Sequence, residues 1–501
     1  MSQLALVHTR AQAGLDAPPV FVEVHLSQGL PALSIVGLPE AAVRESKERV
    51  RSALINSGFD FPTSRITINL GPADLPKEGG RFDLPIALGI LVATDQLPAE
   101  TLKHTVFLGE LTLSGKLRPV TAVLPAAIAC GQAQQALVIP LDNAAVAALA
   151  TGTTLIASHD LRQLYAHLIG QAVITPVPPP SDRHILASYP DLADVRGQSH
   201  AKRALLAAAA GSHHLLFFGP PGTGKTMLAS RLPGILPAMT EDEARDVAAI
   251  YSLTSQAVAD NWQQRPFRAP HHSSSPVSLV GGGSIPKPGE MTYAHHGVLF
   301  LDEMPEFQRQ SLEMLREPLE KGEVIITRAK AQACFPAQFQ LIAAMNPCPC
   351  GYLGDNRRTC RCTPDQVLRY RNKLSGPLLD RIDLQVEVTA QPPEQLLEPH
   401  APEKEDHSEH LRQQVINART RQMDRQGTLN AQLSAKTLQA VCQLGNTETA
   451  FIQRLCEKLS FSARAMHRML KVSRTLADLD GTDAVQKRHL AEAVHYRKFD
   501  K

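Results

Sequence analysis

The first 170 residues alternate short apolar segments with longer segments of mixed polarity, a pattern typical of strands and helices that follow one another. Strand-like segments span residues 20–26, 65–70 and 136–139, and helical segments span residues 40–57 and 83–93. This alternation favours a compact α/β domain, which we place at residues 1–172.

The last hundred residues show a different pattern. Apolar side chains recur there at helical spacing, as at Ala463, Met466, Met469 and Leu470. We therefore predict a small all-helical domain at residues 393–501.

Proline-rich stretches separate these parts from the middle of the chain. Pro176, Pro178, Pro179 and Pro180 favour an extended conformation, so residues 173–189 are interpreted as a semi-rigid linker, with an ordinary surface loop as the alternative. A second break, rich in proline and glutamate, follows at residues 391–407. The sequence thus predicts a central domain at residues 190–392.

Composition excludes some classes of protein. With 43% hydrophobic and 20% charged residues the chain has ordinary globular usage, and a net charge of +2 does not by itself indicate a nucleic-acid binder. The first residues do not resemble a signal peptide, because His8 and Arg10 follow a short apolar stretch. The apolar runs at 86–93 and 204–210 are far shorter than the roughly 20 residues needed to cross a bilayer. We expect a cytoplasmic protein without a membrane partner.

A phosphate-binding loop follows an apolar strand at residues 215–218. The segment Gly219-Pro220-Pro221-Gly222-Thr223-Gly224-Lys225-Thr226 matches G-x-x-x-x-G-K-[ST] and precedes a helix expected to begin near Met227. Its glycines allow backbone N–H groups to surround phosphates. Lys225 is expected to reach the β- and γ-phosphates of ATP, and the Thr226 hydroxyl to bind Mg²⁺.

Polar residues end two further apolar strands. Residues 298–301 are followed by Asp302 and Glu303, a pattern typical of a buried parallel strand with its ligand-binding edge at the carboxyl end. Asp302 is expected to hold Mg²⁺ through water and Glu303 to activate the attacking water. Asn346 follows the strand at 340–345, where its amide would contact the γ-phosphate or the water, or would support a turn.

The order of these motifs resembles that of AAA+ ATPases of the magnesium-chelatase-like branch, and in particular the YifB/ComM family of bacterial competence-related proteins. The likeness extends over essentially the whole chain, including Arg-Pro-Phe-Arg-Ala-Pro-His-His at 265–272, Asn-Pro-Cys-Pro-Cys-Gly at 346–351 and Leu-Leu-Asp-Arg-Ile-Asp at 378–383. It implies a P-loop AAA+ core with a parallel sheet and a helical lid domain. His271 and His272 are expected to shape the surroundings of the site rather than bind a metal.

The resemblance also assigns roles that spacing alone does not. It implies that Asn346 is sensor 1, that Arg381 is an arginine finger reaching a neighbouring subunit, and that Arg464 is sensor 2 at the start of a lid helix. A finger acting in trans implies a hexameric ring. Taken without the family, each arginine would be interpreted as a surface ion-pair partner.

The first domain resembles the Lon-protease-like fold (ribosomal S5 domain 2-like). Residues 76–82 parallel the segment in which Lon proteases place their catalytic serine, yet Arg81 stands at or beside that position, and Leu124 falls where the catalytic lysine is expected. A serine–lysine dyad requires both groups. We therefore predict that this domain is catalytically inactive as a protease.

Four cysteines crowd into an insert at residues 346–364. Cys348, Cys350, Cys360 and Cys362 form two C-x-C pairs, which in a reducing cytoplasm indicate a tetrahedral Zn²⁺ site; a disulfide pair or unligated thiols are the alternatives. The segment around and after the second pair is basic, with Arg357, Arg358, Arg361, Arg369, Arg371 and Lys373.

A predicted hairpin at residues 324–335 carries Arg328 and Lys330 at its tip, where related helicases contact nucleic acid in the pore. Basic side chains at a hairpin tip can hold phosphates without reading the base sequence, although solvated surface charge is the alternative. The loop at Gly281, Gly282 and Gly283, with Lys287, is a second candidate insert.

Three functions are compatible with these features. The first is a DNA-translocating ATPase, a hexameric helicase promoting branch migration on single-stranded or branched DNA during recombination in natural transformation. The second is a magnesium-chelatase-type ATPase subunit, and the third is an ATP-dependent protein-remodelling factor. All three would use ATP and Mg²⁺, with Zn²⁺ at the cysteines.

Overall fold

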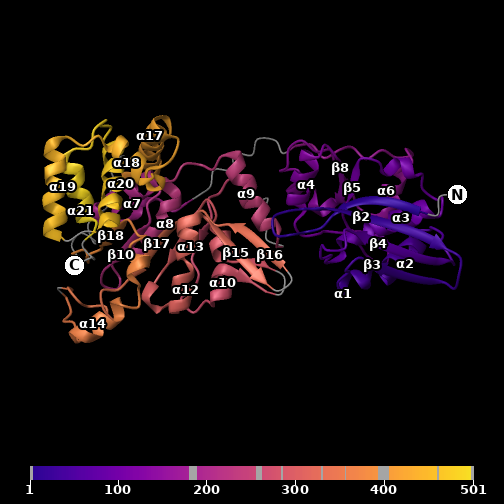
Figure 1. The fold of residues 1–501 in the computed structure, drawn as a ribbon, viewed down its shortest axis with the longest axis horizontal. Helices are drawn as coiled ribbons and strands as arrows, with labels where there is room; N and C mark the ends of the chain where they lie inside the picture. Colours follow the sequence, from indigo (N-terminus) through magenta and orange to yellow (C-terminus); the bar gives the residue numbers. More distant parts are fainter. Residues whose placement is uncertain are drawn as a thin grey trace. The chain divides into compact units, whose positions relative to one another are not determined.

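The computed structural model describes residues 4–179, 189–254, 262–283, 286–328, 331–355, 357–392, 406–459 and 462–497. The chain forms two compact units (Figure 1), namely Met1–Ile185 with Glu241–Trp262, and Leu186–Thr240 with Gln263–Lys501. Their boundary falls within the linker predicted at 173–189. Residues 180–188 of that linker and residues 393–405 of the second predicted break lie outside the described residues.

The first unit is built on a mixed seven-stranded sheet with the order β3-β4-β2-β1-β5-β8-β9. Antiparallel pairing joins β1 to β2 and β2 to β4, and the remaining neighbours are parallel. The strands are β1 (Leu4–Arg10), β2 (Pro19–Ser27), β3 (Ala32–Val36), β4 (Arg65–Gly71), β5 (Thr105–Phe107), β8 (Ala136–Pro140) and β9 (Leu155–Ser158). A short hairpin of β6 (Glu110–Leu111) and β7 (Leu117–Arg118) lies between β5 and β8 in the chain.

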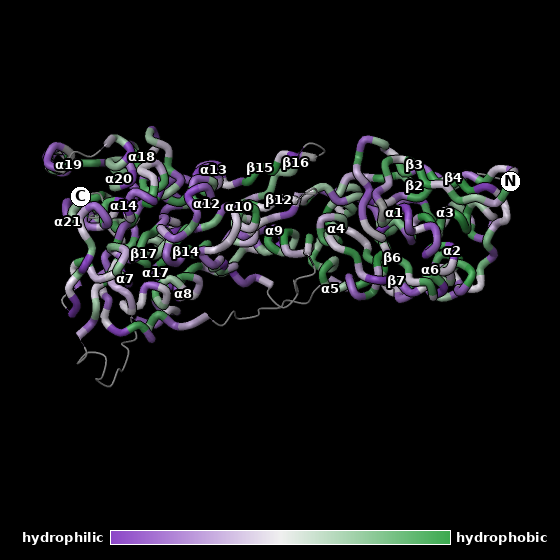
Figure 2. The backbone as a smooth tube through the Cα atoms, turned by 90° about the horizontal axis from the view of Figure 1, so that it is seen from below, coloured by the Kyte–Doolittle hydropathy of each residue, from purple (hydrophilic) through white to green (hydrophobic). Residues whose placement is uncertain are grey.

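Helix α3 (Asp83–Ala93) is the central helix of this unit, and all eleven of its residues are buried. It packs on β1 and β2, and its tube is coloured hydrophobic in Figure 2, whereas α13 (Arg316–Lys321) of the second unit is coloured hydrophilic. The other helices of the unit are α1 (Ala41–Arg44), α2 (Ser46–Asn56), α4 (Val123–Gln132), α5 (Ala144–Ala147) and α6 (Leu161–Leu168).

Helix α9 (Glu241–Ser252) belongs to this first unit although it lies within the sequence range expected for the central domain. Its Ala248 and Ala249 share a buried cluster with Val123 and Leu124 of α4. The backbone N–H of Ala122 donates to the carbonyl of Ser252 at 2.7 Å. The amphipathic face of α9 is thus covered by α4.

The second unit contains a five-stranded, all-parallel sheet with the order β11-β14-β17-β10-β18. Its strands are β11 (Phe267–Arg268), β14 (Val298–Leu301), β17 (Gln340–Met345), β10 (Leu215–Phe218) and β18 (Leu384–Glu387). Every residue of β14, β17 and β10 is buried, as expected for central strands covered on both faces. This confirms the predicted P-loop α/β core.

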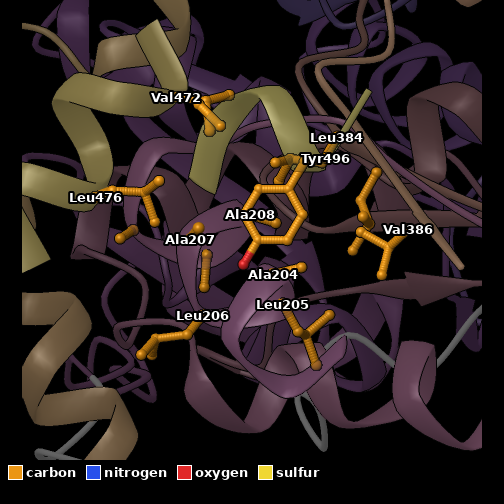
Figure 3. Packing of buried hydrophobic residues seen from close by; sticks show 14 of the residues in the cluster. Ala204, Leu205, Leu206, Ala207, Ala208, Leu384, Val386, Val472, Leu476 and Tyr496 are labelled. Carbon is orange, nitrogen blue, oxygen red and sulfur yellow. The ribbon is translucent and has the colours of Figure 1, made fainter. Parts of the chain in front are cut away.

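Helix α7 (Ser199–Gly211) joins this sheet to the C-terminal helices. Its run of alanines from Ala204 to Ala210, interrupted by Leu205 and Leu206, is buried against β18, α17 and α20. Figure 3 shows the ring of Tyr496 beside Ala204 and Ala208. Because alanine combines high helix propensity with a minimal side chain, the neighbouring elements can pack close to the helix axis.

The C-terminal part is all-helical, as predicted, with α17 (Ser408–Gln426), α18 (Ala435–Cys442), α19 (Asn446–Leu459), α20 (Ala463–Leu479) and α21 (Lys487–His495). It is anchored to the sheet, since the N–H of Gln385 in β18 donates to the carbonyl of Tyr496 at 2.6 Å. A buried polar cluster around Asp478 of α20 includes Arg474 of the same helix and is joined to α17 through Arg425. Within the described residues, no helix is long and apolar enough to cross a membrane.

Candidate active site

The phosphate-binding loop connects β10 to α8 (Lys225–Ile235), so the helix begins two residues earlier than expected. Gly222 and Gly224 adopt left-handed conformations, with φ of 76° and 89°. Gly219 is required for a different reason, because a Cβ at this position would lie 2.1 Å from the carbonyl oxygen of Val388. The loop is therefore shaped to direct N–H groups to its centre, as phosphate binding requires.

Lys225 lies at the centre of this loop and is 8% exposed. Its ammonium donates to the carbonyls of Gly219 and Pro220, both at 2.8 Å, and to the Asn346 side-chain oxygen at 3.3 Å. Burial lowers the pKa of Lys225 to about 8, with Asp302 and Glu303 acting in the opposite direction. A partly desolvated cation of this kind is well suited to anionic phosphate oxygens.

Two carboxylates face the loop from the end of β14. The Thr226 hydroxyl donates to Asp302 at 2.7 Å, which brings the two expected Mg²⁺ ligands together. Their oxygens are hard donors of the kind that Mg²⁺ prefers, so the pair fits that ion.

Glu303 follows Asp302 in a left-handed conformation with φ of 50°, which is uncommon for a residue with a side chain. Its side chain is half exposed, and one carboxylate oxygen lies 3.4 Å from Nδ1 of His272. His272 thus lies in the surroundings of the site, as expected. Backbone strain of this kind is concentrated at functional sites.

A cavity of about 480 Å³ lies between the start of α7, the end of β18 and the end of α21. Gln198 joins its lining to the phosphate-binding loop, because its side-chain amide donates to the carbonyl of Thr223 at 3.3 Å and to that of Thr389 at 2.7 Å. The volume is within the range of small-molecule pockets. The lining residues are Gly197, Gln198, Ser199, His200, Glu387, Thr389, Gln391 and His495.

Sequence reasoning missed these residues. Gln198 has a left-handed backbone with φ of 56° directly before α7, and no motif marks it. The cavity forms only where the start of α7, the end of β18 and the end of α21 meet, so a local pattern could not have revealed it.

Arg381 and Arg464 line one further cavity, of about 180 Å³, together with His467, Arg468 and Lys471. Arg381 is 7% exposed and donates to the carbonyl of Pro377 at 2.6 Å and to the Glu320 carboxylate. Arg464 is exposed in the first turn of α20. Glu320 and Asp380 are the acidic residues among those that line the cavity. The structure thus brings the two predicted arginines together in one cavity, where Arg381 is paired with Glu320.

The position of α20 is fixed from the sheet side. Arg468 donates to Asp383 at 2.5 Å and to the carbonyl of Arg381 at 2.9 Å. Although burial alone would raise the pKa of Asp383, its hydrogen bond with His213 and the charge of Arg468 hold that pKa below the usual range. Asp383 therefore remains a carboxylate that holds the start of α20 to β18.

The four cysteines of the insert converge. All four sulfurs lie within 4.8 Å of one another, and Cys348 is buried whereas the other three are half-buried. None of them forms a disulfide within the described residues. The sequence prediction that these four residues form one cluster is confirmed.

Two hairpins lie next to each other in the chain's central region. One consists of β15 (Glu323–Arg328) and β16 (Ala331–Pro336), and the other of β12 (Gly281–Gly282) and β13 (Lys287–Pro288). The exposed Arg328 donates to the carbonyl of Gly283 at 3.3 Å and so joins the two. Lys330, the other predicted nucleic-acid contact, lies outside the described residues.

Comparison with known proteins places this geometry in a family. Residues 191–396 match the family model "Magnesium chelatase, subunit ChlI", and residues 405–497 match the model of its C-terminal part. The chain is 50% identical to the competence protein ComM of Haemophilus influenzae over 99% of its own length and 97% of the relative's. It is 48% identical to the uncharacterized protein YifB of Escherichia coli, over 99% and 98% of the two chains. The chain belongs to the YifB/ComM family.

Membership in the YifB/ComM family implies ATP hydrolysis, because the matched core is that of a magnesium-chelatase-type AAA ATPase. The mixed N-terminal sheet, the five-stranded parallel sheet and the helical C-terminal part agree with the fold expected for such a chain.

The N-terminal region of this YifB/ComM chain resembles Lon, consistent with 28% identity to Lon protease 2 of Bacillus subtilis over 31% of the chain and 32% of the protease. The model "Subunit ChlI of Mg-chelatase" also matches residues 22–143. Arg81 is buried here and donates to the carbonyl of Thr121 at 2.7 Å and to Gln12 at 3.2 Å. Leu124 is buried in the first turn of α4. An arginine and a leucine therefore stand at the positions expected for the two groups of a serine–lysine dyad.

Proposed function

We propose that this chain is an ATP-hydrolysing motor that acts on DNA during the recombination of incoming strands in natural transformation. The observation that carries the ATPase half is the convergence of Lys225, Thr226, Asp302, Glu303 and Asn346 at the carboxyl ends of three neighbouring parallel strands. The DNA half is supported by the name of the relative from Haemophilus influenzae, a competence protein.

Each residue of the site has a chemical role in this proposal. Lys225 neutralises charge on the β- and γ-phosphates, and Thr226 with Asp302 holds Mg²⁺, which would withdraw charge from the same oxygens. Glu303 accepts a proton from the attacking water. Asn346, already hydrogen-bonded to Lys225, orients the γ-phosphate or that water. The cavity at Gln198 would hold the nucleoside.

The two arginines support a ring of subunits. None of the described residues that line the cavity of Arg381 and Arg464 belongs to the phosphate-binding loop. In this proposal the γ-phosphate that reaches Arg381 comes from a neighbouring subunit, as the resemblance implies for an arginine finger, and a closed hexamer would supply one to every subunit. Delocalised guanidinium groups suit the charge of a transferring phosphoryl group, with Arg381 exchanging Glu320 for the phosphate.

The joined hairpins are the proposed contact with DNA. Arg328 holds β15 to the loop at Gly283, so a movement of one hairpin would be transmitted to the other. Cationic side chains on these joined hairpins would hold phosphates without sequence preference. A translocating motor on single-stranded or branched DNA requires contacts of this kind. Its cofactors would be ATP and Mg²⁺, with Zn²⁺ at the four cysteines.

The DNA half is tested by ATP hydrolysis measured with and without single-stranded and branched DNA, followed by displacement of a branched junction. We expect stimulation by DNA in the unmodified protein. Replacing Arg328 and Lys330 with alanine should abolish the stimulation, leave basal hydrolysis unchanged and reduce the slope of log affinity against log salt by about two.

Lys321→Ala is the matched control, since Lys321 is an exposed lysine that pairs with Glu317 on α13, and it should retain DNA stimulation. Stimulation by an unfolded protein but not by DNA would instead favour a protein-remodelling factor. The match to magnesium-chelatase models makes metal insertion the other candidate, which stimulation by a porphyrin alone would support.

We further infer that the Lon-like unit does not hydrolyse peptides. A guanidinium cannot act as the nucleophile of a serine–lysine dyad, and Leu124 cannot supply the base. Incubation with unfolded casein and ATP should release no acid-soluble peptide beyond that released by the Glu303→Gln variant. ATP-dependent release of peptides would contradict this inference.

A further inference from the structure

We propose that the four cysteines bind one Zn²⁺ and that this metal holds the loop on which the nucleotide site is braced. The site would be structural, with its four thiolates saturating a tetrahedral ion. Its consequence for ATP hydrolysis rests on the proposed function, whereas the metal site itself does not.

The spacing of the sulfurs fits a metal rather than a disulfide. Cys348 and Cys350 have their sulfurs 3.4 Å apart, and the sulfur of Cys360 lies 3.6 Å from each of them. Sulfurs at about 2.3 Å from a tetrahedral zinc would be about 3.8 Å apart, whereas bonded sulfurs are about 2.05 Å apart. The observed distances are close to the tetrahedral value.

A backbone N–H group lies against the sulfurs in the way that a thiolate requires. The N–H of Cys362 donates to the sulfur of Cys360 at 3.4 Å. Such donors stabilise negative charge on sulfur and orient the ligands of a metal. Because four thiolates repel one another without a cation between them, this arrangement favours an ion at its centre.

The cysteine loop contacts the nucleotide site at its beginning. Cys348 is two residues beyond Asn346, so the first ligand fixes the end of β17. Gly351, with φ of 84°, lies against the phosphate-binding loop, since a Cβ at this glycine would be 3.0 Å from Cδ of Pro221. The metal would therefore hold the backbone that separates Asn346 from Pro221.

Helix α14 (Pro364–Arg371) contacts the same site from the other end of the cysteine loop. Its N-cap is Thr363, which lies next to Cys362 and forms a capping box with Gln366. Its Tyr370 is 5% exposed, and the backbone of Asn346 lies near enough to act on its phenolic group. Lys373, just beyond the helix, pairs with Glu306 at 3.1 Å, three residues after Glu303. The loop and the helix thus brace both the asparagine and the segment that carries the acidic pair.

The metal site is tested by elemental analysis of the purified full-length chain. We expect about one zinc per chain in the unmodified protein, and none in the double variant Cys360→Ser/Cys362→Ser. Cys334→Ser is the matched control, because Cys334 is an exposed cysteine outside the cluster, and it should retain the metal. Absence of zinc from the unmodified protein, with no uptake from added zinc, would overturn the site.

The bracing role is tested by hydrogen exchange of residues 219–226 and 340–352, a measurement that does not depend on turnover. Removing zinc from the unmodified protein with a zinc-selective chelator in excess Mg²⁺ should accelerate exchange in both segments, and adding zinc back should restore protection. This reversible treatment remains informative if the double variant does not fold. Unchanged exchange in the zinc-free protein would overturn the bracing role.

Turnover supplies the second measurement. Zinc removal should lower the kcat of ATP hydrolysis about ten-fold or more, since small displacements of a positioning group have effects of that size. Tyr370→Phe should lower kcat with zinc content unchanged, because it removes the phenolic hydroxyl near the backbone of Asn346 and leaves the ligands intact. A zinc-free protein with unmodified kcat would contradict the proposal. If the zinc-loaded protein hydrolysed no ATP, the proposed function would be wrong. Zinc content and hydrogen exchange would still test the metal site and its bracing role.

Discussion

Glu303→Gln is expected to lower the kcat of ATP hydrolysis by about a hundred- to ten-thousand-fold while ATP binding persists. The carboxylate is the group positioned to accept the proton of the attacking water, and general-base catalysis contributes a factor of this size. Glutamine keeps the length and shape of the side chain, so the loop that holds the phosphates should be preserved. The expected signature is loss of phosphate release together with an unchanged dissociation constant for ATP measured by calorimetry.

Lys225→Ala should lose both ATP binding and ATP hydrolysis, because the ammonium is directed into the loop, where it would contact the phosphates. Comparing the two variants therefore separates binding from chemistry. Glu317→Gln, an exposed glutamate on α13 that pairs with Lys321, is the matched control and should hydrolyse ATP normally. If Glu303→Gln kept the unmodified kcat, the base would have to be another group. His272, whose Nδ1 lies 3.4 Å from a carboxylate oxygen of Glu303, would be the next residue to replace.

Asp478→Ala is expected to destabilise the second unit by roughly 3 to 5 kcal/mol, the usual effect of removing one partner of a buried ion pair. The carboxylate accepts from Arg425 at 2.6 Å, from Arg474 at 2.9 Å and from the amide of Asn430 at 2.8 Å. Arg474 is fully buried, so the substitution would leave a guanidinium with only backbone carbonyls as partners. Denaturant unfolding followed by circular dichroism measures the effect.

Asp424→Ala is the control for the loss of one negative charge, since Asp424 is an exposed residue on the same helix α17 as Arg425. It should leave the unfolding midpoint nearly unchanged. Equal midpoints for Asp478→Ala and the unmodified protein would show that the buried cluster is not what joins α17 to α20.

The strands that carry the site could be predicted almost to the residue. The structure has β10 at Leu215–Phe218, β14 at Val298–Leu301 and β17 at Gln340–Met345, the same bounds that the apolar runs predict for these segments. The reason is local, because a continuous apolar run that ends at a glycine or a polar residue fits a strand buried on both faces. Helix α3 was predicted with the same accuracy.

Other boundaries depended on contacts that a local pattern does not contain. Residues 40–57 were predicted as one helical segment, yet the structure has α1 and α2 with a break at Glu45. The next residue, Ser46, donates its hydroxyl to the buried Asp83, and Arg49 pairs with the same carboxylate at 2.7 Å. The position of this segment is thus coupled to a residue on α3 that lies far along the chain.

The sequence by itself determined the phosphate-binding loop, the acidic pair, the cysteine cluster and the type of each major element, because spacing along the chain suffices for these. Only the tertiary structure decided that α9 packs in the first unit, that Arg381 pairs with Glu320 beside Arg464, and that Gly351 lies against Pro221 of the phosphate-binding loop. These contacts join residues distant in sequence whose side chains carry no local signature. Packing, rather than periodicity, selects such partners.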